Sequence, residues 1–159
     1  MRRFWVGLLV LLVLFSFSQV FGFQATGNKK MFSDEQALAA ARLPEVHHMS
    51  LDDTGIPTFV AGRLGSLASN DLEGARQYLQ DVKALFRGTG QEEFRPIKMN
   101  YDGLGLVHMR FQQYFRGLPV VGAEMIVHAD ELSGEVQAIN GKYTPWDDAL
   151  PTWSAMSPI

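Results

Sequence analysis

Residues 105–145 contain three segments of alternating apolar and polar residues, and this stretch constrains the fold more than any other part of the 159-residue chain. Val107 and Met109, for example, are separated by polar residues, a period of two that is typical of a β-strand with one buried face. Short turns at 116–117 and 130–134 each end in a glycine that can adopt a positive φ. We predict three antiparallel strands, at residues 106–115, 119–129 and 135–143.

Further elements are expected upstream. We predict a strand at residues 57–64, because its proline falls at the first position, where a missing N–H is tolerated. Another strand is expected at 94–101, before a turn at Asp102. A short helix is expected to begin after Ser33 and to end before Pro44.

A long helix is predicted at residues 70–87. Asn70 is a suitable N-cap, Glu73 completes a capping box, and Gly88 is suited to the C-terminal cap. Apolar residues recur on one face of this helix, at Leu72, Ala75, Leu79, Val82 and Phe86. The pattern as a whole predicts an α+β fold: an antiparallel β-meander of four or more strands with one long amphipathic helix packed on one face, preceded by a signal peptide.

The first 22 residues are typical of a secretory signal peptide. Two arginines are followed by an almost unbroken apolar run at residues 4–17 and then by small or polar residues. The run is shorter than the roughly 20 residues that span a bilayer. We place cleavage between Gly22 and Phe23, with cleavage after Ala25 as the second choice and an uncleaved anchor as the alternative.

Composition limits the partners and the chemistry. The chain has 14 Lys and Arg residues against 17 Asp and Glu, a net charge of −3, and removal of residues 1–22 takes away two basic and no acidic residues. This balance argues against nucleic acid, whose binders present a basic face. Because the chain has no cysteine, disulfides, thiolate metal sites and thiol nucleophiles are excluded.

No residue pattern supports catalysis. The H-E-x-x-H motif of zinc proteases is missing, and the adjacent carboxylates at 52–53 and 147–148 lie in turn-forming sequence. Ser133 is better explained as a turn residue than as a nucleophile, since it is not in a G-x-S-x-G motif. His47 and His48 are expected in a loop, without the i, i+4 spacing that holds zinc.

His108 and His128 lie on neighbouring predicted strands and raise the question of a metal site. A two-residue turn pairs Phe115 with Leu118, and the same register places His108 opposite Met125. The two histidines then do not meet, and we expect no metal there unless a bulge shifts the register.

Recognition of another protein is the remaining interpretation. A polar sheet face or an exposed edge can bind a partner, whereas an ordinary solvated face is the alternative. Trp146 and Trp153 are candidate anchors for such binding.

The residues of the predicted sheet also match a known pattern: an H-x-R-[FY]-Q-Q strand, a G-x-P-V-x-G turn, an I-V-H strand and a G-x-V-x-x-[IV]-N-G segment. The matching residues are His108, Arg110, Phe111, Gln112, Gln113, Gly117, Pro119, Val120, Gly122, Ile126, Val127, His128, Gly134, Val136, Ile139, Asn140 and Gly141. This combination resembles the fungalysin/thermolysin propeptide domain, the N-terminal pro-region of thermolysin-like zinc metalloproteases. Residues 57–64 and the predicted long helix look like earlier parts of the same family.

The resemblance implies a pro-domain that acts as intramolecular chaperone and latency inhibitor of a secreted metalloprotease, here without the catalytic domain. It implies no catalytic or metal-binding residue in this chain. Zinc, with calcium as a further candidate, would belong to a protease catalytic domain bound in cis or in trans. No nucleic-acid partner and no stable membrane anchor are expected, and the protein would be extracellular or periplasmic. The candidate structural or partner-binding residues are His108, Arg110, Gln112, Gln113, Gly117, Pro119, Gly122, His128, Asn140 and Gly141.

On this interpretation the chain has four parts. They are the signal peptide (1–22), a lead-in with a short helix (23–56), the propeptide domain (57–145) and a linker or truncated start of a second pro-domain (146–159). The alternative function is a freestanding exported structural or interaction domain, or a truncated remnant, with no protease partner. An independent enzyme would need a site of a kind that the sequence does not reveal.

Overall fold

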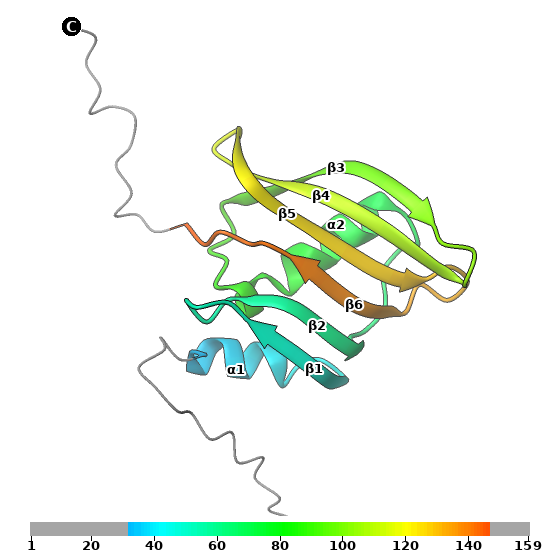
Figure 1. Ribbon diagram of the computed structural model, residues 1–159, viewed down its shortest axis with the longest axis horizontal. Helices are drawn as coiled ribbons and strands as arrows, with labels where there is room; N and C mark the ends of the chain where they lie inside the picture. Colours follow the sequence, from blue (N-terminus) through cyan, green and yellow to red (C-terminus); the bar gives the residue numbers. More distant parts are fainter. Residues whose placement is uncertain (1–31, 147–159) are drawn as a thin grey trace, which may run out of the picture.

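A computed structural model describes residues 32–146, which form a single six-stranded antiparallel sheet with helices on one side (Figure 1). In space the strands follow the order β1-β2-β6-β5-β4-β3. Their bounds are β1 (Glu45–Leu51), β2 (Pro57–Arg63), β3 (Glu92–Tyr101), β4 (Leu106–Phe115), β5 (Leu118–Asp130) and β6 (Val136–Gly141). The helices are α1 (Asp34–Ala40), α2 (Leu72–Asp81) and the 3-10 helix η1 (Lys83–Phe86).

The predicted meander is confirmed, because β3, β4, β5 and β6 are consecutive in both sequence and space. The observed bounds of β4 are those expected from its unbroken alternation, and those of β5 extend one residue further at each end. The earlier hairpin β1–β2 enlarges the sheet, since β2 pairs antiparallel with β6.

Strand β1 was not predicted. His47 and His48, which we placed in a loop, lie within it. Its pairing with β2 is irregular at two points, between Val46 and His48 and between Ser50 and Leu51. These irregularities interrupt the period of two, so the sequence of β1 lacks the alternation that reveals a strand.

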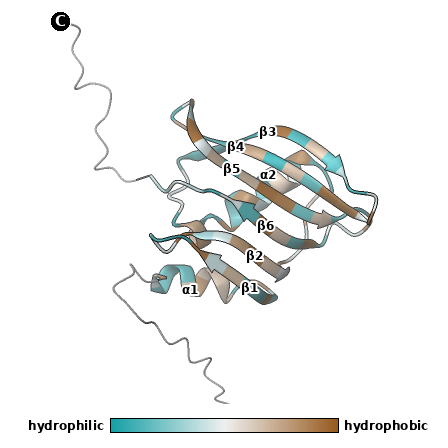
Figure 2. Cartoon of the chain, in the orientation of Figure 1, coloured by the Kyte–Doolittle hydropathy of each residue, from teal (hydrophilic) through white to brown (hydrophobic). Residues whose placement is uncertain are grey.

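The buried face of the sheet packs against α2 and η1 (Figure 1). Brown and teal bands alternate along β4 and β5 in Figure 2, as expected for strands with one apolar face. The largest fully buried side chains come from both layers, and include Ile56, Leu64, Leu79, Leu85, Met109, Phe111, Met125 and Ile139. Within residues 32–146, no helix covers the opposite face.

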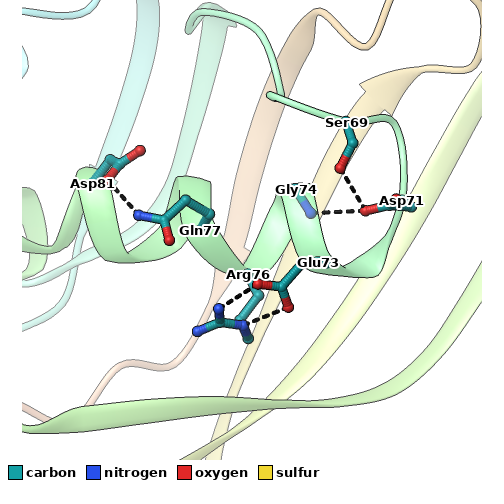
Figure 3. Close-up of polar contacts among 7 residues, drawn as sticks. All are labelled: Ser69, Asp71, Glu73, Gly74, Arg76, Gln77 and Asp81. Carbon is teal, nitrogen blue, oxygen red and sulfur yellow. Dashed lines mark hydrogen bonds and ion pairs between the residues drawn. The ribbon is translucent and has the colours of Figure 1, made fainter.

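The prediction of one long helix at residues 70–87 was wrong. Helix α2 has ten residues, its N-cap is Asp71, and the Asp71 carboxylate accepts a hydrogen bond from the Gly74 N–H (Figure 3). Asn70 instead donates its side-chain amide to the carbonyl oxygen of Glu131 in the β5–β6 turn. After Asp81 the backbone leaves α-helical geometry, and η1 follows.

Gly88 also has a different role from the one predicted. The left-handed residue that ends η1 is Arg87, with φ 62°. A Cβ at Gly88 would lie 2.7 Å from the Tyr143 hydroxyl oxygen and 2.9 Å from the Lys83 Cβ. Glycine is therefore required here for close packing, not for its backbone conformation.

The predicted start of α1 is confirmed. Ser33 and Gln36 form the reciprocal capping box that the sequence indicates. The buried Gln36 amide also donates to the carbonyl oxygens of Gly55 and Leu85, both at 3.0 Å. Gln36 therefore takes part in the cap of α1 and also holds α1 against the β1–β2 turn and η1.

No helix among the described residues is long and apolar enough to cross a membrane. The predicted signal peptide, its cleavage site at Gly22 and Phe23, and Trp153 lie outside residues 32–146.

Candidate partner-binding face of the sheet

Strand β4 sends alternate side chains to opposite faces of the sheet. Val107, Met109, Phe111, Gln113 and Phe115 are buried against the helix layer. His108, Arg110, Gln112 and Tyr114 lie on the other face, which we call the open face. Register partners on β3 and β5 share each face, so the open face extends across the neighbouring strands.

His108 and His128 are directly opposite each other on β4 and β5. Their Nδ1 atoms are 2.6 Å apart and their rings meet edge to face, with centroids 4.8 Å apart. At the two ends of this pair, His108 Nε2 is 3.2 Å from Asp102 Oδ2, and His128 Nε2 is 2.6 Å from Asn140 Oδ1. Four side chains from β4, β5, β6 and the β3–β4 turn therefore form one hydrogen-bonded row.

The prediction that the two histidines do not meet was wrong, and a bulge is the cause. The turn pairs Phe115 with Leu118 as expected, but beyond it residues 120–123 of β5 lie opposite Gln113 alone. Three extra residues of β5 are accommodated there, so His108 faces His128 instead of Met125.

The bulge is stabilised by Gln112 and permitted by Gly122. The Gln112 amide donates to the carbonyl oxygens of Val120 and Ala123, at 2.7 and 2.9 Å. Gly122 adopts φ 75°, a conformation that other residues rarely take. A glycine inside a strand pattern is a recognised sign of a bulge, so Gly122 is the signal that could have corrected the register.

The carbonyl oxygen of the Asn140 side chain fixes the ring protons between the two histidines. Asn140 Oδ1 accepts from His128 Nε2–H, which leaves His128 Nδ1 as the acceptor for His108 Nδ1–H. At the other end of the row, His108 Nε2 lies 3.2 Å from Asp102 Oδ2. The tautomers at the contact of the two rings follow from the pattern of partners.

The surroundings hold His128 in its neutral form. Burial lowers the pKa of His128 and the charge of His108 lowers it further, against opposing contributions from Asn140 and Asp102. The pKa of the Asp102 carboxyl is also lowered, first by the hydrogen bond from the Leu104 N–H and also by the bonds from Leu106 and His108.

Basic side chains lie beside this row. Lys98 on β3 is the register partner of Arg110 on β4, and Arg110 Nη1 donates to Glu124 Oε2 at 2.8 Å. A shallow hollow of about 250 Å³ is lined by Lys98, Asn100, His108, Arg110, Ile126 and His128.

The chain after β6 is held against the C-terminal end of β4. Gln113, which is 1 % exposed, donates to the Thr144 carbonyl at 2.7 Å and accepts from the Thr144 N–H at 3.0 Å. Trp146 stacks on Phe115 with ring centroids 3.5 Å apart. Trp146, a candidate anchor for a partner, thus also has an internal contact.

The remaining candidates lie apart from the open-face row. Asp52 caps its own turn by accepting from Thr54 and Ile56, and Ser133 donates to Asp130 in the β5–β6 turn. Both are turn residues, as predicted. Among residues 32–146, no group of three or more His, Cys, Asp or Glu side chains is arranged to hold a metal ion.

Comparison with known proteins places β3–β6 in a family. Residues 92–143 match the family described as Fungalysin/Thermolysin Propeptide Motif. This segment is a fungalysin/thermolysin propeptide motif. The resemblance drawn from the sequence is therefore confirmed.

The propeptide motif is shared with curated relatives. The chain is 34% identical over 105 residues to the thermolysin of Alicyclobacillus acidocaldarius subsp. acidocaldarius, covering 64% of this chain and 19% of the relative. It is 24% identical over 106 residues to the bacillolysin of Bacillus subtilis (strain 168), covering 67% of this chain and 20% of the relative. The chain spans about a fifth of the length of these proteins.

The candidate residues occupy three environments within the propeptide motif. His108, Arg110, Gln112, His128 and Asn140 contribute to the open face, and Gln113 is buried. Gly117, Pro119, Gly122 and Gly141 shape the backbone at the turn, at the bulge and at the end of β6.

Proposed function

We propose that this chain is the pro-region of a secreted thermolysin-like zinc metalloprotease, and that it acts by binding the protease domain. The observation that carries the proposal is the propeptide motif at residues 92–143, together with its thermolysin and bacillolysin relatives. The pro-region would itself be non-catalytic. The zinc, and calcium where present, would belong to the protease domain.

Binding would supply both latency and assistance in folding. A pro-region that binds the native protease domain better than its unfolded chain shifts the folding equilibrium toward the native state. If it also covers the substrate cleft, the bound protease is inactive until the pro-region is removed. The open face is the surface that we assign to this binding, since no element among residues 32–146 covers it.

The domain limits form part of the proposal. The signal peptide would end at residue 22, a lead-in would run to residue 56, and the propeptide domain would span residues 57–145. The β1–β2 hairpin and the α1–η1 contact extend the folded unit upstream of the matched motif. Residues 146–159 would be a linker or the start of a second pro-domain.

The test is inhibition and refolding of a thermolysin catalytic domain by the purified chain. We expect peptide hydrolysis to fall as the folded chain is added, and the yield of active enzyme after dilution from denaturant to rise. Heat-unfolded chain is the control, because an unfolded polypeptide lowers the measured rate merely as a competing substrate. A folded chain that neither inhibits nor assists refolding would favour the freestanding domain instead.

A further inference from the structure

The hollow on the open face carries a positive charge without a partner. Lys98 is exposed, and among residues 32–146 its ammonium has neither a hydrogen bond nor an ion pair. Its register neighbour is Arg110, also a cation. Like charges directly opposite each other on neighbouring strands are destabilising, so the arrangement favours an anion that satisfies both.

One cation beside the hollow has no acidic partner. Glu124 pairs with Arg110 at 2.8 Å, and Asp102 Oδ2 lies 3.2 Å from His108 Nε2. Among residues 32–146, Lys98 has no such partner. Arg110 also keeps donors that Glu124 does not occupy, because a guanidinium carries five N–H groups.

The dimensions of the hollow indicate the size of its occupant. At about 250 Å³ it is smaller than the roughly 300–1,000 Å³ of typical small-molecule sites. Ile126 contributes an apolar wall beside the two cations. One acidic side chain fits within this volume, with its methylene group against Ile126 and its carboxylate near Lys98 and Arg110, and it supplies the acidic partner that Lys98 lacks.

We propose that the hollow binds a glutamate or aspartate side chain on the surface of the partner protease domain. This inference rests on the proposed function for the identity of the partner. The hydrogen-bonded row from Asp102 to Asn140 fixes one wall of the hollow, and the bulge at Gly122 sets the register that brings His128 to it.

The first arm of the test examines the hollow without the protease. Acetylated, amidated tetraglutamate is titrated into the isotope-labelled chain, and amide and histidine-ring NMR signals are recorded. We expect shifts at residues 98, 108, 110, 126 and 128 that saturate, and no such shifts with capped tetraglutamine. An absence of shifts, or shifts spread over other surfaces, overturns the carboxylate site.

Matched variants identify the charge that matters. Lys98→Glu should abolish the tetraglutamate shifts and Lys98→Gln should reduce them, and because Lys98 is exposed both variants should keep the thermal unfolding midpoint. Arg42→Glu is the control, since it makes the same change of charge at an exposed position just after α1. Equal loss of the shifts in Arg42→Glu would mean that only net charge matters, which overturns the proposal.

The second arm measures binding of the same variants to an immobilised thermolysin catalytic domain. Lys98→Glu should weaken binding roughly tenfold, because it turns an attraction at the interface into a repulsion, while Arg42→Glu should leave it within about twofold. Unchanged binding of Lys98→Glu to a protease that the wild type binds overturns the proposal and leaves the proposed function standing. If the wild type does not bind the protease although tetraglutamate shifts the hollow, the proposed function is wrong and the carboxylate site stands.

Discussion

At the residue scale, His128 links the stability of the sheet to pH. The neutral ring accepts from His108 and donates to Asn140, so protonation of Nδ1 would place two N–H groups 2.6 Å apart and break the row. Among the described residues, the charged and titratable groups near His128 are His108, Asp102, Lys98 and Arg110. The net effect is the lowered pKa of His128.

We therefore expect the free energy of unfolding to fall as the pH drops below about 6.5, the ordinary pKa of histidine. The unfolded chain binds the proton more readily than the folded chain, so this stabilising contribution is complete above that pH and is lost as the pH falls through the lowered folded pKa. Urea unfolding at a series of pH values measures the effect. His128→Gln should flatten the profile, and a variant that keeps the full pH dependence would contradict this role of His128.

At the element scale, two glycines with positive φ support the sheet in different ways. Gly122 adopts φ 75° in the bulge, and a Cβ added there would meet nothing within 4 Å. Gly141 adopts φ 143° at the end of β6, and a Cβ there would lie 2.1 Å from the Glu124 carbonyl oxygen. The first needs glycine only for its backbone conformation, and the second also for space.

The two alanine variants should accordingly differ in stability. We expect Gly122→Ala to cost about 1 kcal/mol, the strain of a left-handed alanine. Gly141→Ala should cost about 3 kcal/mol or more, because steric overlap with the backbone of β5 adds to the strain. Chemical denaturation measures both, and equal costs would contradict the assigned role of Gly141.

The sequence could predict each element as far as its pattern stays regular. β4 was predicted residue for residue because Val107, Met109 and Phe111 alternate without interruption. β1 was missed because its irregular pairing hides the period, and the long helix was wrong because a continuous apolar stripe does not distinguish an α-helix from an α-helix followed by a 3-10 turn.

The candidate site was predicted less well for a different reason. Its residues were identified one by one, but the contact of His108 with His128 depends on the register between two strands. A bulge of three extra residues changes that register, and the apolar–polar alternation within a single strand does not reveal the bulge. Only Gly122 indicated where the bulge would be.

At the scale of the whole molecule, the edges of the sheet favour recognition through its face. Both edge strands, β1 and β3, are irregular, and β3 also contains Pro96, which cannot donate a backbone hydrogen bond. Such features block the addition of a further strand at an edge. Under the proposed function, a partner would therefore bind the open face, where the hollow lies.

The prediction at the scale of the whole molecule is that the protein is exported and that its signal peptide is removed. Expressed with its own N-terminus in a secreting host, the chain should be recovered outside the cytoplasm with Phe23 as its first residue. Mass spectrometry of the intact protein provides the measurement. A protein that begins at Thr26 would indicate the second cleavage site, and one that retains Met1 would contradict the signal peptide.

The two hydrogen bonds between Gln113 and Thr144, with Trp146 stacked on Phe115, hold the end of the folded domain in place. This has a consequence for any segment or domain that is joined to the chain after Trp146. A tether that starts from a fixed point confines its cargo to a smaller volume than one that starts from a free end, and so raises the local concentration of the cargo at the surface of the sheet. A weak contact on the open face could then be occupied most of the time within one polypeptide, and could be lost by dilution once the connection is cut.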